Sequence, residues 1–480
     1  MTQSQTVNDV FVAGKASTKP RIGLLGIMQE LYDDMLPGIT ERQGNYAKQV
    51  AARLEDKAEV LFTAPARDKN DIDERMKEFA QQDVDGILIV MLTYGPAMRT
   101  VRALQNHSRT PILLANIQPV PTVTQDWDMS DLTYNQGVHG AQDMANALLR
   151  TGSSFSVISD DWQSDSFSES VGDWARAAQA IHRLRAMKVA LLGYGMNGMG
   201  DIVGDESAFL RKIGPTIVRE NFGDLLERMD AISDEAIRAA IKIDKENFDI
   251  DPNLTDDNHV YAARVQLAIE ELLQEKGYDA FSFHFEAVGQ DKRFRQLPIL
   301  AASNLMAKGY GFGAEGDTNS AALVAAGHTL IGDAHFTEMY AMDFERDSIL
   351  MSHMGEGNWK VARKDRKPKL IDRELGIGGL DNPPTVLFMG EPGPATLVSL
   401  VALEGERYRL VVSYGDILDT EEVPAIEMPY FHFKPHNGVR ECLNGWLLNG
   451  GTHHQCLNLG DHRGKWQHFC KLLGIEYSEV

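Results

Sequence analysis

The sequence predicts an α/β protein with two parallel-sheet α/β domains followed by a C-terminal β-barrel-like domain. Short apolar runs alternate with helical patterns in the first third of the chain, and a second series of this kind begins at residue 188. From about residue 335 the apolar runs follow one another directly, separated by Gly, Pro and Asp turns. We therefore expect three domains, over residues 1–185, 186–333 and 334–480.

The first domain begins with residues 21–27, an apolar run that predicts a buried strand, and a helical pattern then extends to about residue 55. Further strands are predicted at 58–62, 86–92 and 111–115, with a polar helix over 69–81. This alternation is typical of parallel βαβ units, in which ligands bind at the carboxyl ends of the strands. Gln29, Tyr32 and Tyr94 lie in loops of that kind.

The second domain is predicted to start with a strand at 188–192 and to continue with helices over 227–241 and 260–276. Residues 280–285 alternate like another strand. In the third domain the strand-like runs are 385–389, 395–401 and 408–414, which predict a β-rich domain.

Composition is that of an ordinary globular protein, with 43% hydrophobic and 24% charged residues among 480. The formal charge of −22 argues against nucleic acid or an anionic membrane as the main partner, because either would require clustered Lys and Arg. The first residues lack the features of a secretion signal, and no apolar stretch reaches about 18 residues. Three widely spaced cysteines make a disulfide scaffold or a cysteine-rich zinc site improbable, so we expect a reduced, cytoplasmic protein.

The segment Gly193–Gly198 matches the Gly-x-Gly-x-x-Gly pattern of dinucleotide-binding loops, and it follows a predicted strand. A nicotinamide-dependent oxidoreductase is therefore one hypothesis. However, residues 199–205 contain two more glycines and two aspartates and do not predict the helix whose N-terminus must hold the pyrophosphate. A glycine-rich loop that faces a substrate or connects two elements explains the segment as well.

Four residues in the last third of the chain are candidate metal ligands: Glu315, Glu338, His353 and His454. Each also has a simpler explanation, since Glu315 could cap a helix, Glu338 could be a solvated acid on a strand, His353 a buried core histidine and His454 part of an exposed turn. Two carboxylates with two imidazoles suit a divalent cation such as Mn²⁺. Such a site could chelate an open-chain sugar and make the proton beside its carbonyl easier to remove, with the glutamates acting as acid and base.

Over most of its length the chain resembles L-arabinose isomerase, in the superfamily of L-fucose and L-arabinose isomerases. The order and separation of several motifs carry the resemblance: 29–32 (QELY), 134–140 (YNQGVHG), 296–298 (QLP), 310–317 (YGFGAEGD), 375–379 (LGIGG) and 450–454 (GGTHH).

The resemblance implies two α/β domains and a C-terminal barrel, assembled as a hexamer with active sites at subunit boundaries. It implies one Mn²⁺ per subunit on Glu315, Glu338, His353 and His454, with Glu315 and Glu338 also acting as the acid/base pair that interconverts aldose and ketose through an ene-diol. A hydride shift remains an alternative to proton transfer. Residues that fall where family members line the sugar pocket are Gln29, Leu31, Tyr32, Tyr94, Gln136, His139, Phe285, Tyr340, Ile377 and His453.

The chain departs from the family pattern around the four ligands. Thr318 and Asn319 stand where the family has Trp and Lys, Met339 stands where it has an acid, and Gln142 replaces an Arg. These changes predict retained isomerase chemistry, on L-arabinose or on a different pentose or hexose. A sugar-binding protein without catalytic activity is the remaining alternative.

Overall fold

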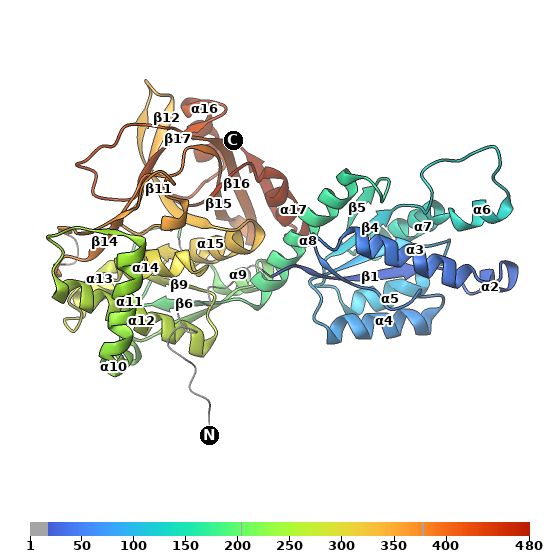
Figure 1. Ribbon diagram of the computed structural model, residues 1–480, viewed down its shortest axis with the longest axis horizontal. Coiled ribbons are helices and arrows are strands. Elements are labelled where there is room, and N and C mark those ends of the chain that lie inside the picture. The colour runs from blue at the N-terminus through green and yellow to red at the C-terminus, as the bar shows by residue number, and fades with distance from the viewer. Residues whose placement is uncertain (1–17, 203, 377–378) are drawn as a thin grey trace. The chain divides into compact units, whose positions relative to one another are not determined.

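The computed structural model describes residues 18–202, 204–376 and 379–480, which form two compact units, 18–182 and 183–480. The predicted class is confirmed, because the chain has parallel-sheet α/β regions followed by a closed antiparallel barrel (Figure 1). Cys442, Cys456 and Cys470 are buried free thiols, as the absence of a disulfide scaffold predicts. Among the described residues, no helix combines the length and apolar character needed to cross a membrane.

The 18–182 unit is an open parallel sheet with strand order β2-β1-β3-β4-β5. Its strands are β1 (Arg21–Ile27), β2 (Glu59–Leu61), β3 (Gly86–Met91), β4 (Ile112–Asn116) and β5 (Ser156–Ser159). The helices are α2 (Leu31–Met35), α3 (Ile39–Arg53), α4 (Lys69–Gln81), α5 (Met98–Asn106), α6 (Met129–Tyr134), α7 (Gly137–Arg150) and α8 (Asp165–Ala186). Every residue of β3 is buried, which is why its sequence is a continuous apolar run rather than an alternating one.

The 183–480 unit begins with a second parallel sheet of order β10-β9-β6-β7. Its strands are β6 (Lys188–Leu192), β7 (Thr216–Glu220), β9 (Ala280–Phe283) and β10 (Gly311–Ala314). Its helices are α9 (Glu206–Lys212), α10 (Phe222–Ala231), α11 (Asp234–Asn247), α12 (Asp256–Lys276), α13 (Phe285–Gln290), α14 (Ile299–Ala307) and α15 (Thr318–Leu330).

The prediction of one helix over 227–241 is wrong, because α10 ends at Ala231 and α11 starts at Asp234. Ser233 separates the two helices: its hydroxyl accepts a hydrogen bond from the backbone N–H of Ala236 and so caps a new helix. The predicted strand over 280–285 is also shorter in the structure, since β9 ends at Phe283 and α13 begins at Phe285.

A six-stranded antiparallel barrel follows, in the order β15-β18-β11-β12-β17-β16, and it closes through pairing of β16 with β15. The strands are β11 (Ala334–Asp343), β12 (Ser348–Ser352), β15 (Gly393–Leu403), β16 (Arg407–Ile417), β17 (Tyr430–Pro435) and β18 (His454–Leu459). β19 (Glu476–Glu479) adds to β16, and helices α16 (Val439–Leu448) and α17 (Arg463–Leu473) accompany the barrel. A small separate sheet contains β8 (Asp249–Ile250), β13 (Lys369–Asp372) and β14 (Pro384–Leu387), with short 3₁₀ turns at η1 (Trp359–Val361) and η2 (Glu404–Glu406).

Helix α15 joins the second parallel sheet to the barrel. It contacts β9 and β10 as well as β11, β15 and β18, and Figure 1 shows it between β9 on one side and β11 and β15 on the other. Its sequence is apolar on nearly every side, and a helix of this kind belongs in a core rather than on a surface. The turn that starts α15 is therefore held against the barrel, and this turn carries Glu315.

Candidate metal and active site

Glu315 lies in the tight turn between β10 and α15. Gly313 lets the two elements approach closely, because a Cβ atom there would lie 2.1 Å from the carbonyl oxygen of Asp317. Glu315 itself has a φ of 60°, in the left-handed region that is costly for a residue other than glycine. Asp317, not Glu315, caps α15, since its Oδ1 accepts from the N–H of Ser320 at 2.9 Å. The helix-capping explanation therefore does not apply to Glu315, and the side chain is available for another role.

The register of the barrel brings the other candidates to the same place. Strand β11 lies between β12 and β18, so that Glu338 is paired with Ser352 on one side and with His454 on the other. His353 follows Ser352 directly. Residues paired across antiparallel strands have neighbouring side chains, so Glu338, His353 and His454 meet at one end of these strands.

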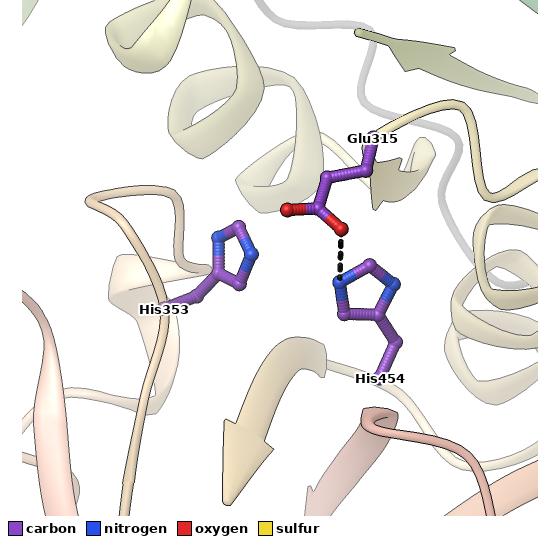
Figure 2. A group of neighbouring side chains, drawn as sticks. All are labelled: Glu315, His353 and His454. Carbon is purple, nitrogen blue, oxygen red and sulfur yellow. Dashed lines mark ion pairs between the residues drawn. The ribbon is translucent and has the colours of Figure 1, made fainter. Parts of the chain in front are cut away.

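Glu315, His353 and His454 form a group whose potential ligand atoms all lie within 4.8 Å of one another. Figure 2 shows the three side chains pointing toward a common centre. His454 Nε2 lies 3.7 Å from Glu315 Oε2, and both atoms are buried without a hydrogen-bond partner in the described part of the chain. Buried polar atoms without partners are costly, and a bound cation would satisfy them.

Each of the two histidines is held from behind by a carboxylate. The Nδ1–H of His353 donates to Glu356 at 2.7 Å, and that of His454 donates to Asp317 at 3.0 Å. Histidines that bind metals commonly donate their other ring nitrogen to a carboxylate, which fixes the tautomer and leaves Nε2 free for the ion. The residues present therefore fit a divalent cation with mixed oxygen and nitrogen ligands.

The charges of the site favour an ionised Glu315. Burial raises the pKa of this carboxyl, but the contact with His453 and the charges of His454 and His353 outweigh burial and leave the pKa below its usual value. Burial lowers the pKa of His353, but the charge and hydrogen bond of Glu356 reverse that effect and raise it. The pKa values of Glu315 and His353 thus both depend on the charges of neighbouring residues in the site.

A cavity of about 400 Å³ lies beside the group, and Glu315, Glu338 and His353 line it. Glu338 does not belong to the 4.8 Å group, although it faces the same cavity. Two residues predicted to bind substrate, Phe285 and Tyr340, also line the cavity. Most of the remaining wall is apolar, formed by Phe283, Leu297, Ile299, Ala314, Met339, Met354 and Leu375. Ile377 lies outside the described residues.

His453 adjoins the group, with ring centroids 4.0 Å from His454 and Nε2 3.5 Å from Glu315 Oε2. Asp201 holds this ring from the other side, accepting from the backbone N–H of His453 at 3.0 Å and from Nδ1–H at 2.6 Å. Burial lowers the pKa of His453, but its contacts with Asp201 and Glu315 are stronger and raise the pKa to about 10. The hydrogen bond from His453 lowers the pKa of Asp201 to about 2.

The other predicted substrate residues that the structure describes lie in the 18–182 unit. Gln29 and Tyr94 follow β1 and β3, and the ring of Tyr94 stacks on His139 with centroids 5.0 Å apart. Gln136 Nε2 is buried without a hydrogen-bond partner among the described residues. Leu31 and Tyr32 begin α2, where Leu31 is exposed. Gln29 and Tyr94 thus lie just beyond the carboxyl ends of two neighbouring parallel strands, where α/β sheets bind ligands.

The glycine-rich segment 193–198 does not lead into a helix, since α9 starts only at Glu206. Instead the loop packs on the turn of Glu315: Met196 N–H donates to the Glu315 carbonyl at 2.9 Å, and a Cβ on Gly316 would lie 2.4 Å from Gly195 Cα. The structure therefore lacks the feature that the dinucleotide hypothesis requires at this position.

Sequence reasoning did not identify Asp201, Asp317 and Glu356 as site residues. Glu356 could have been found, because it stands three residues after His353, within reach of that imidazole. Asp317 could not, because the imidazole that it holds belongs to His454, 137 positions away. Asp201 had no such signal, because its partner is 252 residues away.

Comparison with known proteins gives matches to three domain families that together cover residues 19–476. Residues 19–186 match the L-arabinose isomerase N-terminal domain, 188–332 the central domain and 333–476 the C-terminal domain. A protein of Legionella pneumophila described as an ABC sugar transporter (periplasmic sugar binding protein) aligns at 12% identity over 65% of this chain and 94% of that chain, with a TM-score of 0.16, which is too low to support a relationship.

Full-length relatives are similar over most of the chain. An L-arabinose isomerase of Clostridium beijerinckii is 30% identical over 461 residues, covering 93% of this chain and 92% of the relative. An L-arabinose isomerase of Escherichia fergusonii is 31% identical, covering 82% and 80%, and L-arabinose isomerase 1 of Bacillus licheniformis is 30% identical, covering 84% and 82%.

Proposed function

This chain belongs to the L-arabinose isomerase family, and from that premise we propose that it is a metal-dependent aldose–ketose isomerase that converts L-arabinose to L-ribulose. The proposed metal ligands are Glu315, Glu338, His353 and His454, and the proposed acid and base are Glu315 and Glu338. The proposed sugar-contacting residues are Gln29, Leu31, Tyr32, Tyr94, Gln136, His139, Phe285, Tyr340, Ile377 and His453.

One observation supports the proposal most strongly: Glu315, His353 and His454, which are far apart in the sequence, present ligand atoms within 4.8 Å of one another. Each histidine is already oriented by a carboxylate of its own. Such a carboxylate fixes the tautomer and the orientation of the imidazole that would bind a cation. The cavity beside it has room for a small sugar.

The reaction moves two hydrogens within the sugar. The proton on C2 of the open-chain aldose is transferred to C1, and the hydroxyl proton on O2 is transferred to O1, so that a C1 aldehyde becomes a C2 ketone. One of the two glutamates removes the C2 proton as a carboxylate, and the other supports the proton movement between the oxygens. The pKa of Glu315 lies below its usual value, so this side chain is a carboxylate at neutral pH, the form that can accept a proton. A bound divalent cation would supply Lewis acidity to the sugar carbonyl and hydroxyl.

Further parts of the proposal concern the enzyme as a whole. We propose Mn²⁺ as the metal, one per subunit, because the ligand set combines carboxylate and imidazole. We also propose three domains with the boundaries expected above, assembly into a homohexamer and a cytoplasmic location. The family resemblance supports these points, and sedimentation of the purified protein tests the assembly.

The central experiment offers a panel of pentoses and hexoses to protein loaded with Mn²⁺ and measures ketose formation for each sugar. We expect L-ribulose from L-arabinose, loss of activity on chelation and its return with Mn²⁺. Glu315→Gln and Glu338→Gln are each expected to be inactive, with Glu286→Gln, an exposed acid near the cavity, as the control. Full turnover by either variant contradicts the acid/base assignment, and absence of any ketose contradicts the proposed function.

A different aldose is the second candidate substrate, and Met339 favours it. This residue lines the cavity at the position where the family motif has an acid. Replacing an acid by an apolar side chain removes a group that could bind a sugar hydroxyl, and sites discriminate strongly by such hydrogen bonds. If another sugar in the panel is converted with a higher kcat/KM, that sugar is the substrate.

A further inference from the structure

The glycine-rich loop after β6 carries an acid that reaches the candidate active site. The loop follows the turn of Glu315 through the contacts of Gly195 and Met196, and a few residues later Asp201 meets His453. A connecting loop needs no such contact to join β6 to α9. We therefore expect the contact between Asp201 and His453 to have its function in the active site.

We propose that Asp201 is a positioning residue for the isomerase reaction: it holds the imidazole of His453 so that Nε2 faces Glu315. The inference rests on the proposed function, and it adds a residue to the active site. Asp201 does not line the cavity, and the hydrogen bonds that its side chain makes within the described part of the chain go to His453, so it acts through that residue.

The hydrogen bonds determine both the position and the rotation of the ring. One oxygen of Asp201, Oδ2, accepts from the backbone N–H of His453 at 3.0 Å and from its Nδ1–H at 2.6 Å. The first bond fixes the backbone just before β18, and the second fixes the ring relative to that backbone. Because Nδ1 is occupied, only Nε2 remains to interact with other groups.

As a result, Nε2 of His453 faces the candidate active site. It is buried, lies 3.5 Å from Glu315 Oε2 and has no hydrogen-bond partner among the described residues. At this distance the contact with Glu315 is electrostatic rather than a good hydrogen bond, so the nitrogen keeps the capacity to bind a sugar oxygen. Without Asp201 the ring of His453 could rotate about its side-chain torsions, and Nε2 would no longer be held facing Glu315.

The alternative is that Asp201 only anchors the loop. The two roles differ in what they predict for a double variant. If Asp201 acts through His453, then Asp201→Ala has no further effect once His453 has been replaced by Gln, because the two changes remove the same interaction. If it only anchors the loop, its effect persists in the His453→Gln background.

The test compares Asp201→Ala, Asp201→Asn, His453→Gln and the double variant Asp201→Ala/His453→Gln in the metal-loaded enzyme. We expect Asp201→Ala to lower kcat by about 10- to 100-fold, the usual cost of losing a carboxylate that orients a functional imidazole, with KM unchanged. Asp201→Asn should restore much of the loss, since its amide oxygen can accept the same two hydrogen bonds. Asp205→Asn is the matched control, because Asp205 lies in the same loop but caps α9 through Ser207 and Ala208. Wild-type kcat for Asp201→Ala, or independent effects in the double variant, would overturn the proposal.

A second readout does not depend on activity. The ring ¹⁵N chemical shifts of His453, assigned by the absence of its signals in His453→Gln, should change in Asp201→Ala and remain unchanged in Asp205→Asn. Unchanged shifts in Asp201→Ala overturn the proposal whatever the kinetics show. If the wild-type protein converts no sugar, the proposed function fails, while this measurement still decides whether Asp201 holds the ring.

Discussion

Nδ1 of His353 lies 2.7 Å from a carboxylate oxygen of Glu356, and both side chains are buried. The two residues are three apart in the chain, in the segment that follows β12. His454 has the same kind of partner in Asp317, although that residue is 137 positions away. Glu356, which is close in sequence, and Asp317, which is distant, thus orient the imidazoles of His353 and His454 in the same way.

The first prediction concerns Glu356. Replacing it with Ala should weaken the binding of Mn²⁺ by about 10- to 100-fold, because His353 loses the acceptor that fixes its tautomer and orientation. Competition with a chromophoric chelator measures this affinity, and Glu286→Ala serves as the control. Asp317→Ala should have a similar effect on metal affinity but should also cost about 1 kcal/mol of stability, because Asp317 caps α15. Wild-type affinity in Glu356→Ala would show that the pair does not support a metal ligand.

The second prediction concerns Gly313, where β10 and α15 pack closely next to the turn of Glu315. Gly313→Ala should lower the free energy of unfolding by about 1–3 kcal/mol, because the added methyl group has no room between β10 and α15. Gly464→Ala, at an exposed position of α17 where the added carbon has no atom within 4 Å apart from its own stretch of helix, should not lower stability. Chemical denaturation of both variants tests the comparison, and equal stability of the two would contradict it.

The third prediction concerns stability in acid. Burial, aided by the nearby charge of His353, lowers the pKa of His335 to about 3, while the unfolded chain has the ordinary value near 6.5. Between these values the unfolded state binds a proton that the folded state does not, so stability falls as pH decreases from 6.5 toward 3, by about 1.4 kcal/mol per pH unit from this group.

His335→Gln should therefore reduce the slope of unfolding free energy against pH by close to one proton in that range. It should also be less stable than wild type at neutral pH, because the ring contacts with Phe388 and Phe431 are lost. His436→Gln, at an exposed ring, controls for removal of an imidazole. An unchanged slope in His335→Gln would mean that His335 is not the group responsible.

The fourth prediction concerns the loop at 193–198. Calorimetry with NAD and NADP should detect no tight binding, because the loop packs on Gly316 and no helix begins directly after it. ADP-ribose serves as a second probe, since it carries the pyrophosphate without the nicotinamide. A dissociation constant in the low micromolar range for any of these ligands would restore the oxidoreductase hypothesis.

Much of the fold could be predicted from local patterns. Residues 86–91 are uniformly apolar, and a strand buried on both faces needs that composition, so β3 was predictable from a few residues. Residues 227–241 show where reasoning from local patterns fails, because they were predicted to form one helix and belong to two. Apolar residues recur on both sides of residues 232–233, but Ile232 and Ser233 have extended backbone conformations, and the Ser233 hydroxyl caps a second helix.

The candidate ligands were also predictable, because their residue types and motifs are visible in the sequence. Their meeting at one place in the fold could not be predicted from the sequence. It depends on the register of β11 with β12 and β18, which pairs Glu338 with Ser352 and His454, and on α15, which brings Glu315 against the barrel.

The sequence by itself thus determined the chemical types of the ligands, the alternation of strands and helices, and the strong net negative charge, because these follow from single residues and short periods. Only the tertiary structure decided that Asp201 meets His453 and that Asp317 supports His454, since hydrogen bonds between residues more than a hundred positions apart depend on the whole path of the chain. The physical reason is the range of the interactions: propensity and periodicity act over a few residues, whereas a metal site requires atoms from distant segments to meet within a few ångströms.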